Sequence, residues 1–348
     1  MSEPLRVAVV GLGYWGPNLL RNLVELGDAE VVTMCDTRDE RLEHWGRRYP
    51  AIERTTSYMD VLSDDRVEAV VIATPVATHF ELASRALRFG KHTFVEKPLA
   101  GSSEEAEELF RLSRHAGRVL MPGHTFLYSP PVVLVKELID RGDLGEIYFI
   151  SSSRVNLGLH QADVSVVWDL GPHDFSILRY WLGESPESVS ALSRACVVPD
   201  MPDVAFINLR YPSGAIAQIE LAWLAPSKLR RTAVVGSERM VVYDDASSEP
   251  VRVFNSGASL PDPGSFGEYQ LSYRTGDIVS PQVAPIEPLY RQMEDFCAAV
   301  RQRTEPRSSA RLGLEVVQTI EAVDRSLQAG GSPASIRHDS PAVAGMPV

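Results

Sequence analysis

The sequence lacks the features that mark several large classes of protein. Its 348 residues include only three cysteines, Cys35, Cys196 and Cys297, and no Cys-x-x-Cys pair. Three scattered cysteines give no disulfide framework, so we expect a reducing, cytoplasmic compartment. No apolar run approaches the roughly 18 residues of a membrane-spanning helix. The first residues also lack the basic segment and cleavage site of a secretory signal.

Positive charge is scarce as well. Lysine and arginine number 34 against 46 aspartates and glutamates, a formal net charge of -12. This balance disfavours nucleic acid and anionic membranes as partners. The chain has no His-Glu-x-x-His, no Cys/His cluster with metal spacing, no Gly-x-Ser-x-Gly and no Walker loop. We therefore expect no metal site, and no acyl-transfer or ATP-hydrolysing chemistry.

The first third of the chain alternates between two patterns. Short apolar runs predict strands at 5–11, 30–36, 67–74, 91–96 and 118–121. Helical patterns lie between them at 16–26, 38–49, 78–90 and 103–116. Alternation of this kind is typical of an α/β fold with a parallel, doubly wound sheet of the Rossmann type. We predict such a domain over residues 1–123.

The pattern then changes to strands in succession. After a helix at 131–141, strands are predicted at 146–156, 187–198, 203–211, 214–224, 229–236 and 239–244, with one helix at 172–182. Tyr-Pro-Ser-Gly at 211–214 indicates a hairpin turn. Residues 255–288 read as a long loop, followed by helices at 287–303 and 311–329 and a flexible tail at 330–348. We predict a second, α+β domain over 124–329 with a large, mostly antiparallel sheet.

A glycine-rich turn follows the first predicted strand. In Gly-Leu-Gly-Tyr-Trp-Gly at 11–16, Gly11 would allow a tight turn, Gly13 close approach of a pyrophosphate, and Gly16 close helix–strand packing. Asp36 ends the next strand, 20 residues after Gly16, where a carboxylate binds ribose hydroxyls. A carboxylate repels a 2′-phosphate, so NAD is favoured over NADP. Arg38 could stack on adenine, meet a 2′-phosphate, or simply be solvated.

Two further segments offer groups that move protons. Glu96-Lys97-Pro98 closes a predicted strand, and Pro98 favours extended geometry before it, which would aim Lys97 off the carboxyl edge of the sheet. Glu96 could pair with Lys97 or face the core. Asp169 and His173 lie four residues apart and share a helix face if the helix already runs through Pro172. A carboxylate near an imidazole supports its role as a proton acceptor. The alternatives are a surface lysine and an aspartate that only caps the helix.

Other polar residues lie near these motifs. Thr74 and Pro75 end a strand, and His79 opens the following helix. His124 and Tyr128 mark the passage between domains. A polar substrate pocket could be lined by Arg154, Asn156, His160 and Trp168, although packing or solvent exposure explains them equally well.

Taken in order, these motifs resemble those of the Gfo/Idh/MocA oxidoreductases, the glucose–fructose oxidoreductase and inositol dehydrogenase group. The resemblance runs from Leu5 to about Leu327. It rests on the segments at 11–16, 73–79 (Ala-Thr-Pro-Val-Ala-Thr-His) and 90–98, on Gly123-His124, and on Asp169 with His173. It implies last helices that pack back on the first domain. It also implies a sheet whose outer face forms homodimers or homotetramers.

The resemblance also implies an enzyme that moves a hydride between NAD and a CH–OH group of a small polyol. Lys97, Asp169 and His173 would be catalytic. The cofactor would contact Gly11, Gly13, Tyr14, Trp15, Gly16, Asp36, Thr37, Arg38, Thr74, Pro75, His79, Glu96 and Lys97. The substrate would contact Lys97, His124, Tyr128, Arg154, Asn156, Trp168, Asp169 and His173.

The implied substrates are cyclitols, sugars or nucleotide-linked sugars. The runs at 14–18 and 168–174 look most like those of members acting on nucleotide-linked sugars. Three alternatives stay open: a redox-neutral, NAD-dependent glycoside hydrolase, a dinucleotide sensor without chemistry, and a reductase of imines or tetrapyrrole-like compounds. Asn156 and His160 make a polyol the better fit than the last of these.

Overall fold

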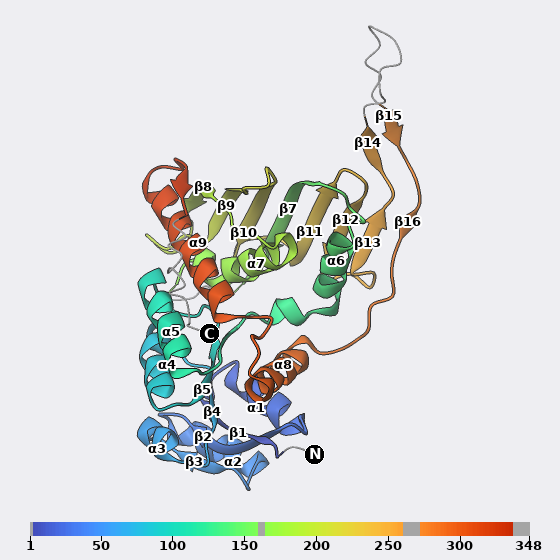
Figure 1. Ribbon diagram of the computed structural model, residues 1–348. Helices are drawn as coiled ribbons and strands as arrows, with labels where there is room; N and C mark the ends of the chain where they lie inside the picture. Colours follow the sequence, from blue (N-terminus) through green and yellow to red (C-terminus); the bar gives the residue numbers. More distant parts are fainter. Residues whose placement is uncertain (1–2, 159–163, 260–271, 337–348) are drawn as a thin grey trace, which may run out of the picture.

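The computed structural model describes residues 3–158, 164–259 and 272–336, which form two domains, one above the other in Figure 1. The first domain contains a sheet with helices on both of its faces. The second contains a broader sheet that carries helices on the face turned toward the viewer. No helix in these three ranges is long and apolar enough to cross a membrane.

The first domain has the predicted parallel sheet, with strand order β3-β2-β1-β4-β5-β6. Its strands are β1 (Leu5–Val10), β2 (Ala29–Cys35), β3 (Glu53–Thr55), β4 (Ala69–Ile72), β5 (His92–Glu96) and β6 (Leu120–Gly123). Its helices are α1 (Gly16–Glu25), α2 (Asp39–Arg48), α3 (Tyr58–Ser63), α4 (His79–Arg88) and α5 (Ser103–Ala116). The central strand β4 is apolar throughout, Ala-Val-Val-Ile, because helices cover both faces of the sheet.

Two elements of this domain were not predicted, β3 and α3. Strand β3 is three residues long and polar, Glu-Arg-Thr, because it lies at the sheet edge beside β2. Helix α3 has only six residues, too few for a periodic pattern. The strand order reverses between β1 and β4, and ligands of open α/β sheets bind at such a point, outside the carboxyl ends of the strands.

The second domain has the predicted large sheet, with nine strands in the order β16-β13-β12-β11-β7-β10-β9-β8-β17. Neighbours pair antiparallel except β7 with β10, which are parallel. The longer strands are β7 (Ile147–Val155), β8 (Ser188–Arg194), β9 (Val204–Arg210), β10 (Ile216–Ala222), β11 (Leu229–Gly236), β12 (Met240–Asp244) and β13 (Val251–Phe254). The turn at 211–214 joins β9 to β10, as predicted.

Residues 255–288 are not one long loop. They contain β14 (Gly257–Ser259), β15 (Ser272–Arg274) and β16 (Ile278–Val279), and β13 before them was also missed. These strands have two to four residues, so their pairing partners rather than a local pattern define them. The tail is likewise paired at first, because β17 (Ala334–Ser335) joins β8. The rest of the tail, 337–348, lies outside the described residues.

Four long helices complete the fold: α6 (Pro130–Asp140), α7 (Val166–Leu182), α8 (Pro288–Gln302) and α9 (Ala310–Gln328). Helix α7 begins six residues before its predicted start at 172. Pro172 therefore lies inside the helix, where it cannot donate to the carbonyl four residues before it. The consequence is that both Asp169 and His173 are helical.

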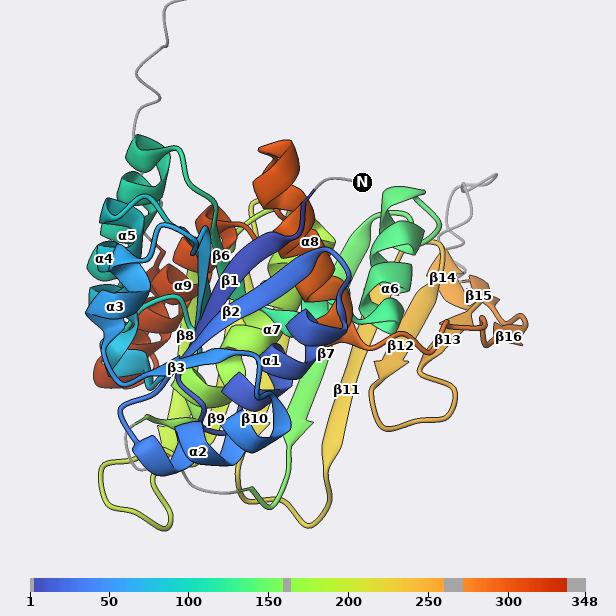
Figure 2. The ribbon, with the colours of Figure 1, turned by 90° about the horizontal axis from the view of Figure 1, so that it is seen from below.

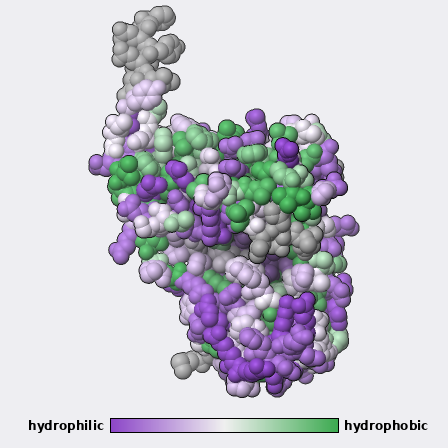
Figure 3. All heavy atoms as spheres, turned by 180° about the vertical axis from the view of Figure 1, so that it is seen from behind, coloured by the Kyte–Doolittle hydropathy of each residue, from purple (hydrophilic) through white to green (hydrophobic). Residues whose placement is uncertain are grey.

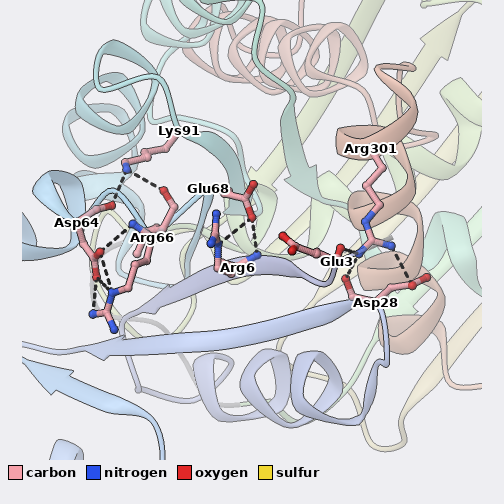
Figure 4. Close-up of polar contacts among 9 residues, drawn as sticks. Glu3, Arg6, Asp28, Asp64, Arg66, Glu68, Lys91 and Arg301 are labelled. Carbon is pink, nitrogen blue, oxygen red and sulfur yellow. Dashed lines mark hydrogen bonds and ion pairs between the residues drawn. The ribbon is translucent and has the colours of Figure 1, made fainter. Parts of the chain in front are cut away.

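The last two helices contact the first domain. Helix α8 packs on α1, and α9 packs on α5 and β6. The Arg301 guanidinium of α8 bonds the Glu3 carbonyl and the Asp28 carboxylate at the amino edge of the parallel sheet (Figure 4). At the other end of α8, Glu287 accepts from Arg21 of α1 at 2.5 Å. Seen from below, β1 and β2 of the first domain lie in front of the second domain (Figure 2).

Candidate active site

A cavity of about 730 Å³ opens at the carboxyl edge of the parallel sheet, at the β1/β4 reversal. We call it the glycine-loop cavity. Most of the predicted cofactor residues line it: Gly11, Gly13, Tyr14, Trp15, Asp36, Thr37, Thr74, Pro75, Glu96 and Lys97. The sequence motifs therefore meet at one site.

The glycines of the loop have distinct steric roles. Gly11 has φ +90°, and a Cβ there would lie 2.5 Å from the Ala73 carbonyl oxygen. A Cβ on Gly16 would lie 1.8 Å from the Gly11 carbonyl oxygen. At Gly13 the nearest atom to a Cβ is the Arg41 guanidinium, at 3.7 Å, so the backbone there faces open space. A tight turn with one unshielded stretch of backbone fits the pyrophosphate of a dinucleotide.

Asp36 lies at the end of β2, with only 5% of its surface exposed. Its carboxylate accepts the Leu12 N–H at 2.7 Å and the Arg38 N–H at 2.9 Å. Arg41 forms an ion pair with it at 3.2 Å and lines the cavity. Arg38 is exposed and outside the cavity lining, so its contact with the cofactor stays a prediction. Arg41 was missed, although its place in the first turn of α2 brings it within reach of Asp36.

Gly16 and His79, two predicted cofactor residues, do not line the cavity. The His79 ring is buried, with Nδ1 2.8 Å from the Pro98 carbonyl oxygen and Nε2 2.9 Å from the Thr74 carbonyl oxygen. Burial lowers the pKa of His79. The ring thus joins the loops that follow β4 and β5, and it does not line the cavity itself.

Lys97 extends from the end of β5 toward the second domain. Its Nζ donates to the Asp169 carbonyl oxygen at 2.8 Å and to Asp169 Oδ1 at 3.2 Å. The indole Nε1 of Trp223 donates to Asp169 Oδ2 at 3.2 Å. Because Lys97 belongs to the first domain while Asp169 and Trp223 belong to the second, this cluster joins the domains at the edge of the cavity.

His173 lies one helical turn beyond Asp169 and faces a second cavity. This cavity of about 390 Å³, here the histidine cavity, meets the glycine-loop cavity at Trp15, Glu96 and Lys97. The imidazole packs edge-on against Phe126, with ring centroids 4.9 Å apart. Burial, together with the nearby cations led by Lys97, holds the pKa of His173 well below its usual value. The ring is therefore unprotonated at neutral pH.

The expected support of His173 by Asp169 is not made. Among the described residues, His173 Nδ1 has no hydrogen-bond partner, and both carboxylate oxygens of Asp169 are bonded by Lys97 and Trp223. The four-residue spacing does place Asp169 and His173 on one helix, but the Asp169 carboxylate bonds the Lys97 ammonium of the first domain. Asp169 therefore orients Lys97 instead.

Two more buried groups surround Lys97. Glu96 lines both cavities, and burial raises its pKa to about 7. Its Oε2 accepts the backbone N–H of Lys97 at 3.2 Å. Glu96 therefore contacts the backbone of Lys97, rather than forming an ion pair with the Lys97 ammonium. His124 is buried near Lys97, and burial lowers its pKa to about 3. Neither ring nitrogen of His124 has a partner in the described structure, and the ring lines neither cavity.

Several predicted substrate residues face elsewhere. The Tyr128 hydroxyl donates to Asp295 at 2.6 Å, and the Trp168 indole donates to Asp324 at 2.8 Å. Arg154 is buried beneath Phe126 and bonds Asp174 at 2.5 Å. Asn156 lies just past β7, where its N–H pairs with Ala222, and it lines neither cavity. None of these four side chains lines either cavity, and His160 lies outside the described residues.

The histidine cavity contains residues that were not predicted as site residues, although Asn18 lies in the run at 14–18. They come from separate strands, helices and loops brought together by the fold: Asn18, Thr125, Phe126, Ser129, Arg230, Asp245, Glu287, Pro288 and Leu289. No local motif could reveal them. Within the described ranges, no three His, Cys, Asp or Glu side chains gather in a group that could hold a metal ion.

The parallel sheet carries a glycine-loop cavity, and a lysine and a histidine line the cavity that adjoins it. These features define a dinucleotide-binding oxidoreductase. Residues 5–124 match the description "Oxidoreductase family, NAD-binding Rossmann fold", and residues 132–242 match "GFO/IDH/MocA C-terminal domain". The chain belongs to the GFO/IDH/MocA oxidoreductase family.

Individual relatives agree with this assignment. A solved structure from Magnetospirillum magnetotacticum MS-1 is 30% identical, with a TM-score of 0.78, and the match covers 92% of this chain and 99% of that one. The scyllo-inositol 2-dehydrogenase (NAD(+)) of Bacillus subtilis (strain 168) is 28% identical over 75% of this chain and 80% of its own. The dTDP-3,4-didehydro-2,6-dideoxy-alpha-D-glucose 3-reductase of Actinomadura kijaniata is 30% identical over 56% of this chain and 60% of its own.

Proposed function

We propose that the protein transfers a hydride between NAD and a secondary alcohol or ketone of a polyol. The substrate is a sugar, free or nucleotide-linked, or a cyclitol. The observation that carries this proposal is that Lys97 and His173 line the same cavity, and that Lys97 also lines the adjoining glycine-loop cavity. NAD, when bound, supplies the hydride acceptor; the residues of the chain supply the proton transfer and the charge stabilisation.

In the direction of oxidation, His173 accepts the proton of the substrate hydroxyl. Its imidazole is unprotonated at neutral pH, so its ring nitrogen is free to accept a proton. Lys97 Nζ donates a hydrogen bond to the same oxygen and stabilises its developing negative charge. Asp169 holds the ammonium in place through two contacts. Reduction of a ketone follows the same path in reverse.

The cofactor preference for NAD rests on Asp36. Its buried carboxylate stands at the strand end where the ribose hydroxyls bind, and a 2′-phosphate would be repelled there. Arg41 is the group that could accept a 2′-phosphate, but its guanidinium is engaged by Asp36. Two relatives support the substrate class, since one is named for an inositol and NAD(+), the other for a dTDP-linked sugar.

The test is NADH formation by the purified protein with free sugars, inositols, and UDP- or dTDP-linked sugars. Lys97→Met and His173→Gln should each lower turnover by about 10²–10⁴-fold, the usual range for loss of a positioned proton-transfer group. His173→Gln should leave the affinity for NAD unchanged, since His173 does not line the glycine-loop cavity. Near-full turnover in either variant would disprove its assigned role.

The same experiment separates the alternatives. A redox-neutral glycoside hydrolase would release sugar without accumulating NADH. A sensor would bind NAD and turn over nothing, in which case neither substitution would have a measurable effect. Lys97, Asp169 and His173 line the two adjoining cavities. This arrangement favours an enzyme over a sensor, because a protein that only binds NAD requires none of the three.

We further propose that the protein is a cytoplasmic homodimer or homotetramer formed through the outer face of the large sheet. Large apolar side chains are exposed on that face: Phe149 (43%), Leu192 (62%), Phe206 (45%) and Ile216 (53%). Figure 3 shows the molecule from behind, with hydrophobic residues gathered over the upper domain between polar ones. Exposed apolar patches of this kind mark protein–protein contact sites.

A further inference from the structure

One wall of the histidine cavity is an ion pair that the proposed reaction does not use. Arg230 is the second residue of β11, and Asp245 directly follows β12. Arg230 Nη1 lies 3.0 Å from Asp245 Oδ2, and the Asp245 N–H donates to the Arg230 carbonyl oxygen, also at 3.0 Å. The Tyr243 hydroxyl donates to Asp245 Oδ1 at 3.3 Å. The pair is thus fixed by the hairpin itself.

The Arg230 guanidinium and the His173 imidazole both lie close to the Phe126 ring. Phe126 contacts His173 at 4.9 Å between ring centroids, and the Arg230 guanidinium lies 5.7 Å from the same Phe126 centroid. Both groups line the same cavity. A substrate ring whose reacting hydroxyl meets His173 would therefore bring its remaining hydroxyls toward Arg230 and Asp245.

Each cation around this cavity is paired with an acid. Lys97 is paired with Asp169 at 3.2 Å, and Arg230 with Asp245 at 3.0 Å. Beneath the wall, Arg154 is paired with Asp174 at 2.5 Å. The remaining ionisable residues on the described wall are the acids Glu96 and Glu287 and the imidazole of His173, whose lowered pKa leaves it neutral. No cation of that wall is left uncompensated, so it offers no free charge for a carboxylate or phosphate.

The Arg230–Asp245 pair nevertheless remains accessible, with 33% and 28% of the side chains exposed. It presents hydrogen-bond donors and an acceptor side by side. Two neighbouring hydroxyls match this arrangement because each can both donate and accept. An anionic group would have to displace Asp245 from Arg230 and leave a partly buried carboxylate without its partner.

We propose that Arg230 and Asp245 recognise a pair of adjacent hydroxyls on an uncharged sugar or cyclitol ring, and so determine which polyol is accepted. This inference rests on the proposed function and narrows its substrate class. In a nucleotide-linked sugar, the uncharged ring would occupy the histidine cavity while the phosphates remain outside it.

The test compares neutral and acidic partners of one ring: glucose with glucuronate, and UDP-glucose with UDP-glucuronate. NADH formation and calorimetric binding in the presence of NAD are both measured. The wild type should prefer the neutral partner of each pair. Arg230→Ala should lower kcat/KM for the neutral probe by about 10- to 100-fold, the effect of losing charged hydrogen bonds, without weakening NAD binding.

Asp245→Asn is the sharper variant, since it leaves Arg230 uncompensated. The ratio of kcat/KM for the neutral probe to kcat/KM for the acidic probe should fall at least about tenfold, the effect of roughly one charged hydrogen bond. Arg239→Ala is the matched control, because Arg239 is exposed at the other end of the same hairpin and outside the cavity. Thermal midpoints of all variants establish that each one folds.

The outcomes separate the two proposals. If the wild type neither binds nor oxidises any neutral probe, the proposed function fails, and this inference with it. If the wild type oxidises neutral probes but Arg230→Ala and Asp245→Asn behave like Arg239→Ala, only this inference is overturned. A wild type that prefers glucuronate or UDP-glucuronate overturns it as well.

Discussion

Glu96 is a single residue whose burial should affect stability as a function of pH. Its pKa is about 7 in the fold, against 4.5 for a free side chain. Because the folded pKa is raised, its contribution to stability is fully present below pH 4.5 and is lost as pH rises through about 7. Glu96→Gln cannot ionise but still offers an oxygen to the Lys97 N–H.

The Glu96→Gln variant should therefore have a higher thermal midpoint than the wild type at about pH 8 and the same midpoint at about pH 4. Scanning calorimetry of both proteins across this range is the measurement. A difference between the two midpoints that does not change with pH would show that the Glu96 side chain is not titrating in the fold.

Asp36 and Arg41 make a second prediction for individual residues. Asp36→Ala removes the carboxylate that repels a 2′-phosphate and frees the Arg41 guanidinium to bind one. We expect the ratio of NADP to NAD affinity to rise at least about tenfold, roughly one charged hydrogen bond. The added change Arg41→Ala should cancel the gain, whereas Arg38→Ala should not. The measurement is a titration of each variant with NAD and with NADP. An unchanged ratio of the two affinities would assign the cofactor selectivity to other groups.

The site residues that could be predicted from sequence are those with a local signature. Gly11, Gly16 and Asp36 follow from the spacing of one βαβ unit, and Lys97 from its position at a strand end. Trp223 and Arg230 could not be predicted, because antiparallel strands bring them to the site from far along the chain. The partner of Asp169 was also misjudged, since a lysine from another domain lies closer to its carboxylate than the histidine on its own helix.

At the scale of elements, the turn between β1 and α1 depends on Gly16. Gly16→Ala would place a methyl group 1.8 Å from the Gly11 carbonyl oxygen, so the turn must open. We expect NAD affinity to fall at least about 100-fold, since pyrophosphate recognition depends on this backbone. Gly27→Ala is the control, because nothing lies within 4 Å of its Cβ position. Calorimetric titration with NAD measures both, and equal affinities would refute this role of Gly16.

The elements predicted correctly are those with a strong period or a long apolar run. The five predicted strands of the first domain and the helices α8 and α9 are of this kind. The start of α7 was missed because Pro172 reads as a first-turn residue, whereas buried packing around Val166, Val167 and Phe175 keeps the helix intact through it. The short strands β13 to β17 depend on neighbours in the sheet, so their own sequences carry little signal.

At the scale of the whole molecule, the exposed face of the large sheet should determine the oligomeric state. Phe206 and Ile216 lie on adjacent strands of this face, and burying such side chains contributes about 1.5–3 kcal/mol each. Phe206→Glu or Ile216→Glu would place an unpaired charge in the interface, so we expect light scattering to show the mass of a monomer. Phe89→Glu is the matched control, because Phe89 is 47% exposed but belongs to the first domain. A monomeric wild type, or sheet variants with unchanged mass, would place any self-association on another surface.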